Sequence, residues 1–141
     1  MEGITIKDGL KNMDFEKVTE MLSNAFWCKG IKVDEVIKGA ENSALVVGVF
    51  IDTNQIGYAR VISDKTRFAY ILDVYVDESF RRKGLGQKMI QYILGHEELT
   101  DVYQWLLITK DAHGVYSKVG FDPVSRPLDW MEIRKDRPKR I

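Results

Sequence analysis

The stretch from Ile71 to Met89 reads ILDVYVDESFRRKGLGQKM, and its pattern changes twice along its length. Its first six residues are β-branched, aromatic or leucine apart from one aspartate, which is typical of a strand. Asp77 begins a short turn. After Gly84, Leu85 and Met89 stand four residues apart, so they share one face of a helix. We therefore predict a strand, a basic loop and an amphipathic helix in direct succession.

The loop between that strand and helix, RRKGLG at residues 81–86, combines positive charge with two glycines. The start of a helix leaves unpaired backbone N–H groups and the positive end of the helix dipole, and both attract phosphate. Gly84 and Gly86 carry no Cβ atom, so a pyrophosphate can approach the backbone closely. The loop is therefore predicted to hold a diphosphate group.

Two other phosphate-binding signatures do not fit this loop. The dinucleotide fingerprint G-x-G-x-x-G requires a third glycine where Met89 stands. A Walker A loop requires Gly-Lys-Ser/Thr, but Gly86 is followed by Gln87 and Lys88.

Working outward, the chain alternates between helical and strand patterns without repeats or linkers. We predict strands at Ile4–Ile6, Ala44–Ile51, Ile56–Ile62, Phe68–Val76 and Trp105–Ile108. The predicted helices are Phe15–Phe26, Val33–Lys38, Gly84 to about Gly95, and Ala112–Lys118. One or two closing strands are expected from Phe121 onward and at Trp130–Ile133. This order predicts an α+β fold, with a mixed, mostly antiparallel sheet flanked by helices.

Two motifs resemble those of the GNAT family of N-acetyltransferases. Arg81-x-x-Gly84-x-Gly86, after a Val-x-Val strand, is similar to the family's coenzyme A-binding signature R/Q-x-x-G-x-G/A. The segment AHGVYSKVGF at residues 112–121 is similar to the family's A-x-x-L-Y-x-K-x-G-F helix. One departure is Thr109, which stands where the family often has asparagine. The resemblance covers nearly the whole chain and is strongest to small, single-domain bacterial members.

The resemblance implies an acyl-CoA N-acyltransferase fold of α/β/α layers, formed by one domain over residues 1–141 with a core at about 3–134 and a basic tail at 134–141. It also implies acetyl-CoA as co-substrate and no metal. Tyr116 would protonate the departing thiolate. The strand Phe68–Val76 would pair with pantetheine, and the basic loop would surround the pyrophosphate. The implied cofactor-binding residues are Val74, Tyr75, Val76, Arg81, Arg82, Lys83, Gly84, Leu85, Gly86, Gln87, Thr109 and Tyr116.

The acceptor half of the site is less well specified. Four aromatic residues from the predicted helices and strands would line it: Phe26, Trp27, Tyr58 and Tyr70. Arg60 could recognise a substrate carboxylate. Each of these residues is equally compatible with a structural role, the aromatics in the core and the arginine in a salt bridge or in solvent. We expect an amine to attack the thioester directly in a ternary complex. Asp73 is the candidate base, since a carboxylate is unusual among apolar strand residues, and alternation places it on the face opposite Val74 and Val76.

Other candidate groups have ordinary structural interpretations. Asp73 itself is equally compatible with a surface aspartate. His113 has a suitable pKa for a base but starts a helix, and His96 follows a helix end. Cys28 is the single cysteine and has no partner motif, so packing is its expected role.

Composition limits the class of protein. The 141 residues include 21 basic and 21 acidic side chains, but residues 134–141 carry +4 and the rest −4. A uniformly basic nucleic-acid binder is therefore unexpected. One cysteine excludes an internal disulfide, and the sequence has neither a signal peptide nor a span of about 18–20 apolar residues, so we expect a cytoplasmic protein without membrane contact.

Three functions remain open at this point. The first is an acetyl-CoA-dependent N-acetyltransferase with a small-molecule or peptide amine as substrate. The second is a non-catalytic acyl-CoA-binding or regulatory domain of the same fold. The third, which the acidic body disfavours, is a nucleic-acid-associated protein. A homodimer is plausible by family analogy alone.

Overall fold

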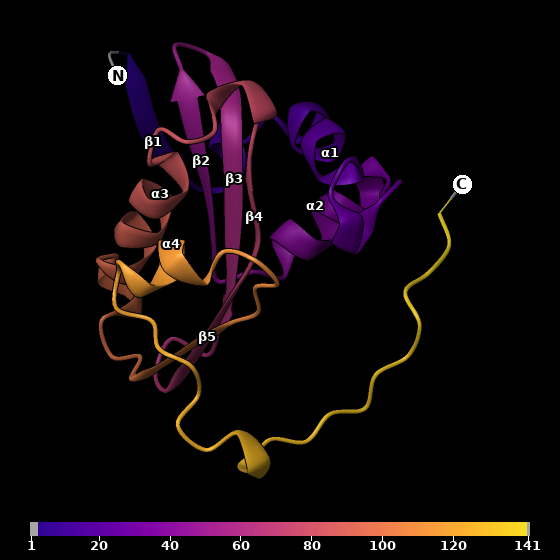
Figure 1. The fold of residues 1–141 in the computed structure, drawn as a ribbon. Helices are drawn as coiled ribbons and strands as arrows, with labels where there is room; N and C mark the ends of the chain where they lie inside the picture. Colours follow the sequence, from indigo (N-terminus) through magenta and orange to yellow (C-terminus); the bar gives the residue numbers. More distant parts are fainter. Residues whose placement is uncertain (1–2, 141) are drawn as a thin grey trace.

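The computed structural model describes residues 3–140 and contains a five-stranded sheet in the order β1-β2-β3-β4-β5 (Figure 1). Strands β1 to β4 are antiparallel neighbours, and β5 runs parallel to β4. The strands are β1 Ile4–Asp8, β2 Leu45–Ile51, β3 Asn54–Ser63, β4 Phe68–Val76 and β5 Gln104–Leu107. A mixed, mostly antiparallel sheet is therefore confirmed.

Helices cover both faces of this sheet. Helices α1 (Phe15–Ser23) and α2 (Val33–Glu41) lie on one face, and α3 (Leu85–Leu94) and α4 (His113–Ser117) on the other (Figure 1). Two apolar clusters result, one between the sheet and α3 and one between the sheet and α1 with α2. Strand β2 contributes to both clusters, which explains its continuous apolar run. The α/β/α layering predicted from the sequence is confirmed.

Local sequence accounts for the first helix, although its end differs from the prediction. The Asp14 side chain accepts a hydrogen bond from the Lys17 backbone N–H at 3.2 Å and so caps α1. Helix α1 ends at Ser23, and a separate 3-10 turn spans Phe26–Cys28. The prediction of one helix through Phe26 is therefore wrong, because the chain becomes extended at Ala25 before it turns again.

Strand β4 contains an irregularity at its centre. Tyr58 of β3 pairs with Tyr75 of β4, and Arg60 pairs with Leu72. Between these two pairs β3 has one residue, Ala59, whereas β4 has two, Asp73 and Val74, so β4 contains a β-bulge. Asp73 has φ of 55°, an uncommon value for a residue with a side chain. Beyond this bulge Val74 packs on the α3 cluster, whereas Asp73 bonds to groups on the α1–α2 face. The predicted opposition of these two side chains is confirmed.

Strands β4 and β5 pair over only part of their length. The pairing runs from Phe68 with Gln104 to Ile71 with Leu107 and then stops. Strand β4 continues to Val76, and no strand of residues 3–140 pairs with its far half on that side. The two strands therefore part beside α3, and backbone groups of β4 are left open to a ligand.

The predicted closing strands are wrong. Residues 121–126 and 130–140 have no regular structure, and Pro127–Asp129 forms a single 3-10 turn. After α4 the chain leaves the sheet and swings outward (Figure 1). The residues at Trp130–Ile133 favour a strand, but a strand forms only where a partner edge is available, and here the chain does not lie along one.

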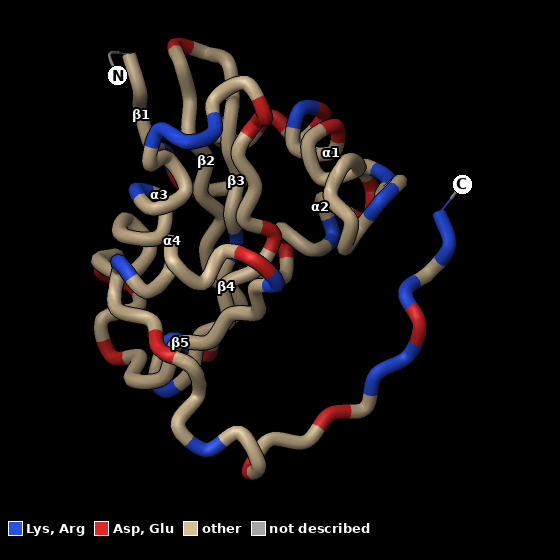
Figure 2. The backbone as a smooth tube through the Cα atoms, viewed as in Figure 1, with Lys and Arg blue, Asp and Glu red and all other residues tan. Residues whose placement is uncertain are grey.

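Two further features of the described residues bear on function. No helix between residues 3 and 140 is long and apolar enough to cross a bilayer. Figure 2 shows that Lys and Arg recur along the outward-swinging C-terminal segment, in keeping with its positive charge in the sequence.

Candidate functional site

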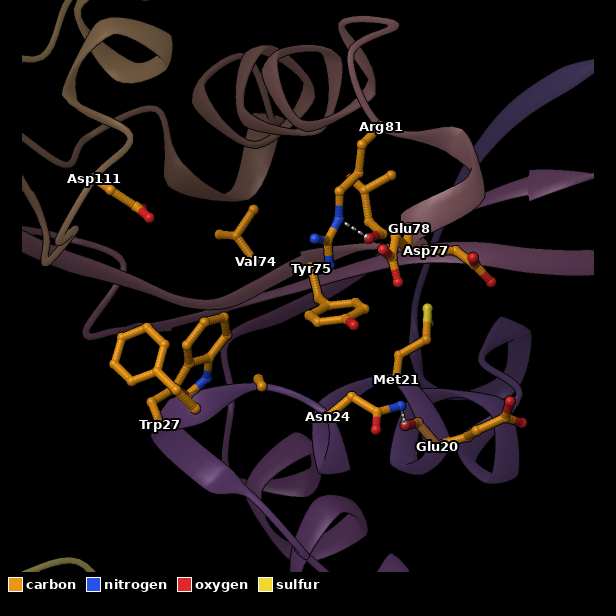
Figure 3. A pocket seen from close by; sticks show the side chains of 13 residues that line it. Glu20, Met21, Asn24, Trp27, Val74, Tyr75, Asp77, Glu78, Arg81 and Asp111 are labelled. Carbon is orange, nitrogen blue, oxygen red and sulfur yellow. Dashed lines mark hydrogen bonds between the residues drawn. The ribbon is translucent and has the colours of Figure 1, made fainter.

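A cavity of about 750 Å³ lies between the α1 side of the molecule and the end of β4 (Figure 3). Its size is in the range of small-molecule sites. Helix α1 and the 3-10 turn after it form one wall, β4 and the turn after it form the other, and one residue before α4 completes it. The lining residues are Glu20, Met21, Asn24, Ala25, Phe26, Trp27, Val74, Tyr75, Val76, Asp77, Glu78, Arg81 and Asp111.

The basic loop leads directly into α3. Gly84 is the residue before the helix, with φ of 76°, and no side chain caps the helix start. The first helical hydrogen bond is from the Lys88 N–H to the Gly84 carbonyl at 3.0 Å. The N–H groups that precede Lys88 in α3 therefore have no intrahelical acceptor. Arg82 and Lys83 are exposed beside them, so the arrangement suits an anion.

Gly86 has no structural reason to be glycine. A Cβ atom added there would meet nothing within 4 Å, and its φ is not in the left-handed region. Glycine inside a helix is less favourable than alanine by about 0.8–1.0 kcal/mol. Gly84 differs, because its positive φ alone favours glycine. The space over Gly86 is therefore empty room at a helix start, which a closely approaching ligand would need.

Arg81 is held by β4 and is directed away from the rest of the loop. Its Nε donates to the Val76 carbonyl at 2.8 Å, and its guanidinium lies 5.0 Å from the centre of the Tyr75 ring (Figure 3). Of the three basic residues in the loop, Arg81 thus borders the large cavity, while Arg82 and Lys83 extend into solvent.

Tyr116 lies in α4, half-buried against the cluster under α3. Its ring meets Phe121 edge-on at 6.1 Å. Burial raises the pKa of the Tyr116 phenol, so the hydroxyl stays protonated at neutral pH and can donate a proton. Nearby, the Thr109 hydroxyl accepts a hydrogen bond from the Ala112 N–H at 3.0 Å and so stabilises the turn into α4.

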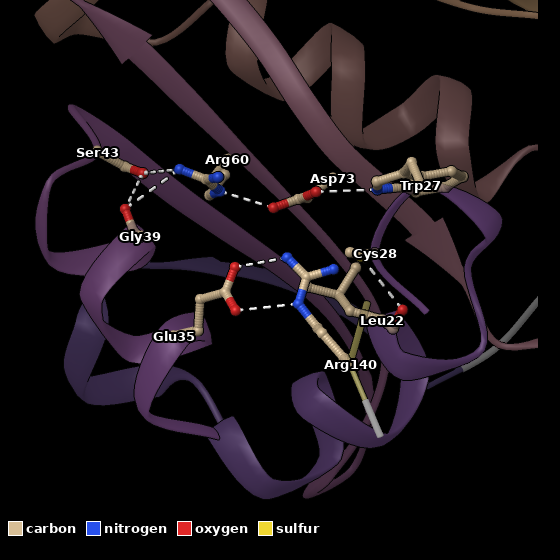
Figure 4. Close-up of polar contacts among 9 residues, drawn as sticks. All are labelled: Leu22, Trp27, Cys28, Glu35, Gly39, Ser43, Arg60, Asp73 and Arg140. Carbon is tan, nitrogen blue, oxygen red and sulfur yellow. Dashed lines mark hydrogen bonds and ion pairs between the residues drawn. The ribbon is translucent and has the colours of Figure 1, made fainter. Parts of the chain in front are cut away.

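Asp73 is the centre of a hydrogen-bond network (Figure 4). Trp27 Nε1 donates to one carboxylate oxygen at 3.0 Å, and Arg60 Nε donates to the other at 2.7 Å. Arg60 also donates through Nη1 to the Gly39 carbonyl and the Ser43 hydroxyl. The side chains of Asp73 and Arg60 are only 13% and 18% exposed. This ion pair is therefore largely shielded from water, and most of the Arg60 guanidinium is already bonded within the protein.

A second cavity, of about 290 Å³, lies under α2 beside this network. Tyr58, Arg60 and Asp73 line it, whereas Phe26 and Trp27 line the larger cavity. The Tyr58 hydroxyl is buried without a hydrogen-bond partner among the described residues. The structure thus divides the predicted acceptor residues between two neighbouring cavities. Tyr70 borders neither, and burial is the main cause of its raised pKa.

Carboxylates around the larger cavity were missed in the sequence. Glu20, Glu78 and Asp111 come from three separate parts of the chain, and Arg81 is the one basic residue in the lining. Asp77 is also there but is paired with Lys17 at 3.1 Å. Glu20 in α1 and Asn24 directly after it stand four residues apart, so the sequence could have shown that they share one side of the helix. Only the fold shows that this side borders β4.

The other titratable candidates lie in structural contacts. The Cys28 thiol is buried, donates to the Leu22 carbonyl at 3.2 Å, and burial is the main reason that its pKa rises to about 11. His96 bonds to Asp8 on β1, and His113 is exposed at the start of α4. Within residues 3–140 no three His, Cys, Asp or Glu side chains are grouped as metal ligands.

Comparison with known proteins gives the family. The profile described as Acetyltransferase (GNAT) domain matches residues 42–123. A Xanthomonas campestris pv. campestris protein assigned to the GNAT family is 31% identical, with 96% of this chain and 95% of that one covered and a TM-score of 0.89.

More distant structures share the fold. A Staphylococcus aureus protein is 24% identical (TM-score 0.73; 93% of this chain and 100% of that one). A Clostridium acetobutylicum protein solved with acetyl-CoA is 14% identical (TM-score 0.70; 93% and 96%). No curated protein sequence matches the chain significantly. The profile spans more than half of the chain, and the Xanthomonas protein matches almost all of it, so this protein belongs to the GNAT family of acetyltransferases.

Proposed function

We propose that this protein is an acetyl-CoA-dependent N-acetyltransferase, which moves the acetyl group to a primary amine by direct attack in a ternary complex. The observation that carries the proposal is the empty space over Gly86, at an uncapped helix start beside the open half of β4. These features together fit a ligand with a diphosphate at one end and an extended amide-containing arm.

The proposed donor half of the site uses these features. Backbone N–H groups at Leu85, Gly86 and Gln87 would donate hydrogen bonds to the diphosphate, and Arg82 and Lys83 would add positive charge. The unpaired half of β4, including Val74, would pair with the pantetheine amides. When bound, acetyl-CoA supplies a thioester carbonyl carbon that an amine can attack.

Two proton transfers accompany the exchange of bonds. The amine nitrogen forms a bond to the carbonyl carbon, the carbon–sulfur bond breaks, and the sulfur leaves as a thiolate. Tyr116 would give that thiolate its proton, since its raised pKa keeps the phenol protonated. The attacking amine must lose a proton, and we propose Asp73 as its acceptor. Because Asp73 lines the smaller cavity and not the larger one, the proton would travel to it through a bridging water.

The acceptor is proposed to arrive as a cation. Glu20, Glu78 and Asp111 line the large cavity together with Arg81, and these carboxylates could hold a positively charged group. The cations Lys110 and Arg137 lie over the ring of Phe26, 5.4 and 5.6 Å from its centre, so we place the incoming cation on the side of Glu20 and Glu78. A primary amine is mostly protonated near neutral pH, as the lysine reference pKa of about 10.4 illustrates. The charge of the lining thus supports an amine over a carboxylate as the group that enters first.

A second candidate function is a non-catalytic acyl-CoA-binding domain. The engagement of both Asp73 oxygens favours it, because a carboxylate that is already bonded is a weaker base. A thiol-release assay separates the two. With acetyl-CoA and a panel of polyamines, amino acids and lysine peptides, an acetyltransferase releases free thiol, and Tyr116→Phe lowers kcat by about 10²-fold or more. Binding of acetyl-CoA without thiol release from any amine would establish the non-catalytic function.

A further inference from the structure

The C-terminal segment, residues 122–140, is anchored to α2 at its far end. Arg140 makes a two-pronged ion pair with Glu35, at 2.7 and 3.1 Å (Figure 4). The Arg140 side chain is only 14% exposed. The Arg140 backbone lies against Gly30, so close that a Cβ atom added to the glycine would be 3.0 Å from the Arg140 carbonyl oxygen. The lack of a side chain at Gly30 therefore leaves room for this anchor.

The anchor brings Arg137 to the larger cavity. The Arg137 guanidinium lies 5.6 Å from the ring centre of Phe26, which lines that cavity. Lys110, in the bend before α4, places its Nζ 5.4 Å from the same ring centre. Residues 122–139 are exposed, and their backbone hydrogen bonds within the described chain are local. The position of Arg137 therefore depends on the anchor three residues away.

The two ends of the larger cavity differ in charge. Trp27 lies at one end, and Glu20 and Glu78 lie toward the other (Figure 3). Phe26 packs edge-on against Trp27 with ring centres 5.2 Å apart, so the two cations over Phe26 belong to the first end. Asp111 borders that end as well, which leaves it one net positive charge. Neither cation forms an ion pair with an acid of residues 3–140, so each can pair with a ligand.

We propose that the C-terminal segment completes the acceptor site and selects an acceptor with a carboxylate besides its amine, as in an amino acid. This inference rests on the proposed function. The amine lies toward Glu20 and Glu78, and the carboxylate pairs with Arg137 and Lys110 at the other end. A diamine would instead bring a second cation against those two. Arg140 touches neither group of the acceptor and is a positioning residue.

Binding of L-lysine and cadaverine, which differ by one carboxylate, tests this proposal. Ligand-detected NMR gives both Kd values with coenzyme A present, which has no acetyl group to transfer. The wild type should bind L-lysine more tightly than cadaverine. Arg137→Gln should raise the Kd of L-lysine by about three- to fivefold and leave that of cadaverine unchanged or lower it. Arg140→Gln and Glu35→Gln should act alike, because each releases the anchor. The control Lys139→Gln removes one charge at an exposed position of the segment and should change neither Kd.

Two further readouts separate positioning from a general loss of charge. The double variant Arg137→Gln, Arg140→Gln should bind L-lysine no more weakly than Arg137→Gln alone, since both changes remove the same contact. The preference of the wild type for L-lysine should disappear in about 1 M NaCl, where charges are screened beyond about 3 Å.

Failure of this inference differs from failure of the proposed function. Absence of thiol release with acetyl-CoA contradicts the acetyl transfer, whereas the two Kd values are measured without any transfer. Equal affinity of the wild type for the two probes, or binding of neither, would overturn the selection of a carboxylate. L-lysine binding that Arg137→Gln or Arg140→Gln leaves unchanged would overturn the role of the segment.

Discussion

Replacing Gly86 with alanine should separate the stability of the protein from its affinity for acetyl-CoA. In the unliganded protein an added Cβ meets nothing within 4 Å, so no contact opposes the better helix propensity of alanine. Gly86 is the second residue of α3, where the preference for alanine is smaller than in a helix interior, so the free energy of unfolding should rise by up to about 0.8–1.0 kcal/mol. For a domain of this length that corresponds to an increase in Tm of roughly 2–6 °C.

The same methyl group should weaken acetyl-CoA binding. If the diphosphate lies over the start of α3, the Cβ introduced by Gly86→Ala would occupy its space and hold it away from the free N–H groups. We expect Kd to rise at least tenfold, which is about 1.4 kcal/mol. Thermal unfolding without ligand and isothermal titration calorimetry with acetyl-CoA measure the two effects in one preparation.

A matched control lies on the same helix. Gln91 is exposed on α3, so Gln91→Ala should change Tm little and leave Kd unchanged. The reasoning about Gly86 is refuted if Gly86→Ala lowers Tm without ligand, or if it raises Tm and leaves the affinity for acetyl-CoA intact. The first result would mean that packing requires the glycine, and the second that the diphosphate lies elsewhere.

Four more outcomes are expected. Burial raises the pKa of Tyr116 above its ordinary value of 10, so the phenol keeps its proton at moderately alkaline pH. The fall in kcat that follows loss of this proton should therefore lie above pH 10, and the Tyr116→Phe variant should not show it. Asp73→Asn leaves Arg60 without its counter-ion, so the free energy of unfolding measured in urea should fall by about 1–3 kcal/mol. The control Asp52→Asn, in an exposed turn, should change that free energy by less than about 0.5 kcal/mol. Glu20→Gln with Asp111→Asn should raise KM for a cationic amine and reduce its dependence on salt, with KM for acetyl-CoA unchanged. Cys28, with a pKa of about 11, should react with a thiol reagent at pH 8 far more slowly in the native protein than in urea.

The local structure of residues 71–89 was predictable because its signals are local. A strand, two glycines, three basic residues and an amphipathic helix follow one another within 19 residues, and each has its own chemical reason. The face of Asp73 followed from strand alternation in the same way. The hydrogen-bond partners of Asp73 could not be predicted in this way. Trp27 and Arg60 lie 46 and 13 residues away in the sequence, and no local pattern indicates that they contact Asp73.

The acceptor half and the C-terminus show the limits of local patterns. The carboxylates of the large cavity come from α1, the turn after β4 and the residue before α4, so only the packing of these elements brings them together. Residues 130–133 have the composition of a strand, but pairing needs an edge within reach.

The most direct test of the central claim is mass spectrometry of the products formed from acetyl-CoA and a panel of primary amines. The account predicts that one amine gains a single acetyl group for each coenzyme A thiol released, and that Tyr116→Phe slows both equally. If acetyl-CoA binds but neither an acetylated amine nor free thiol forms with any member of the panel, the proposed acetyltransferase activity is contradicted.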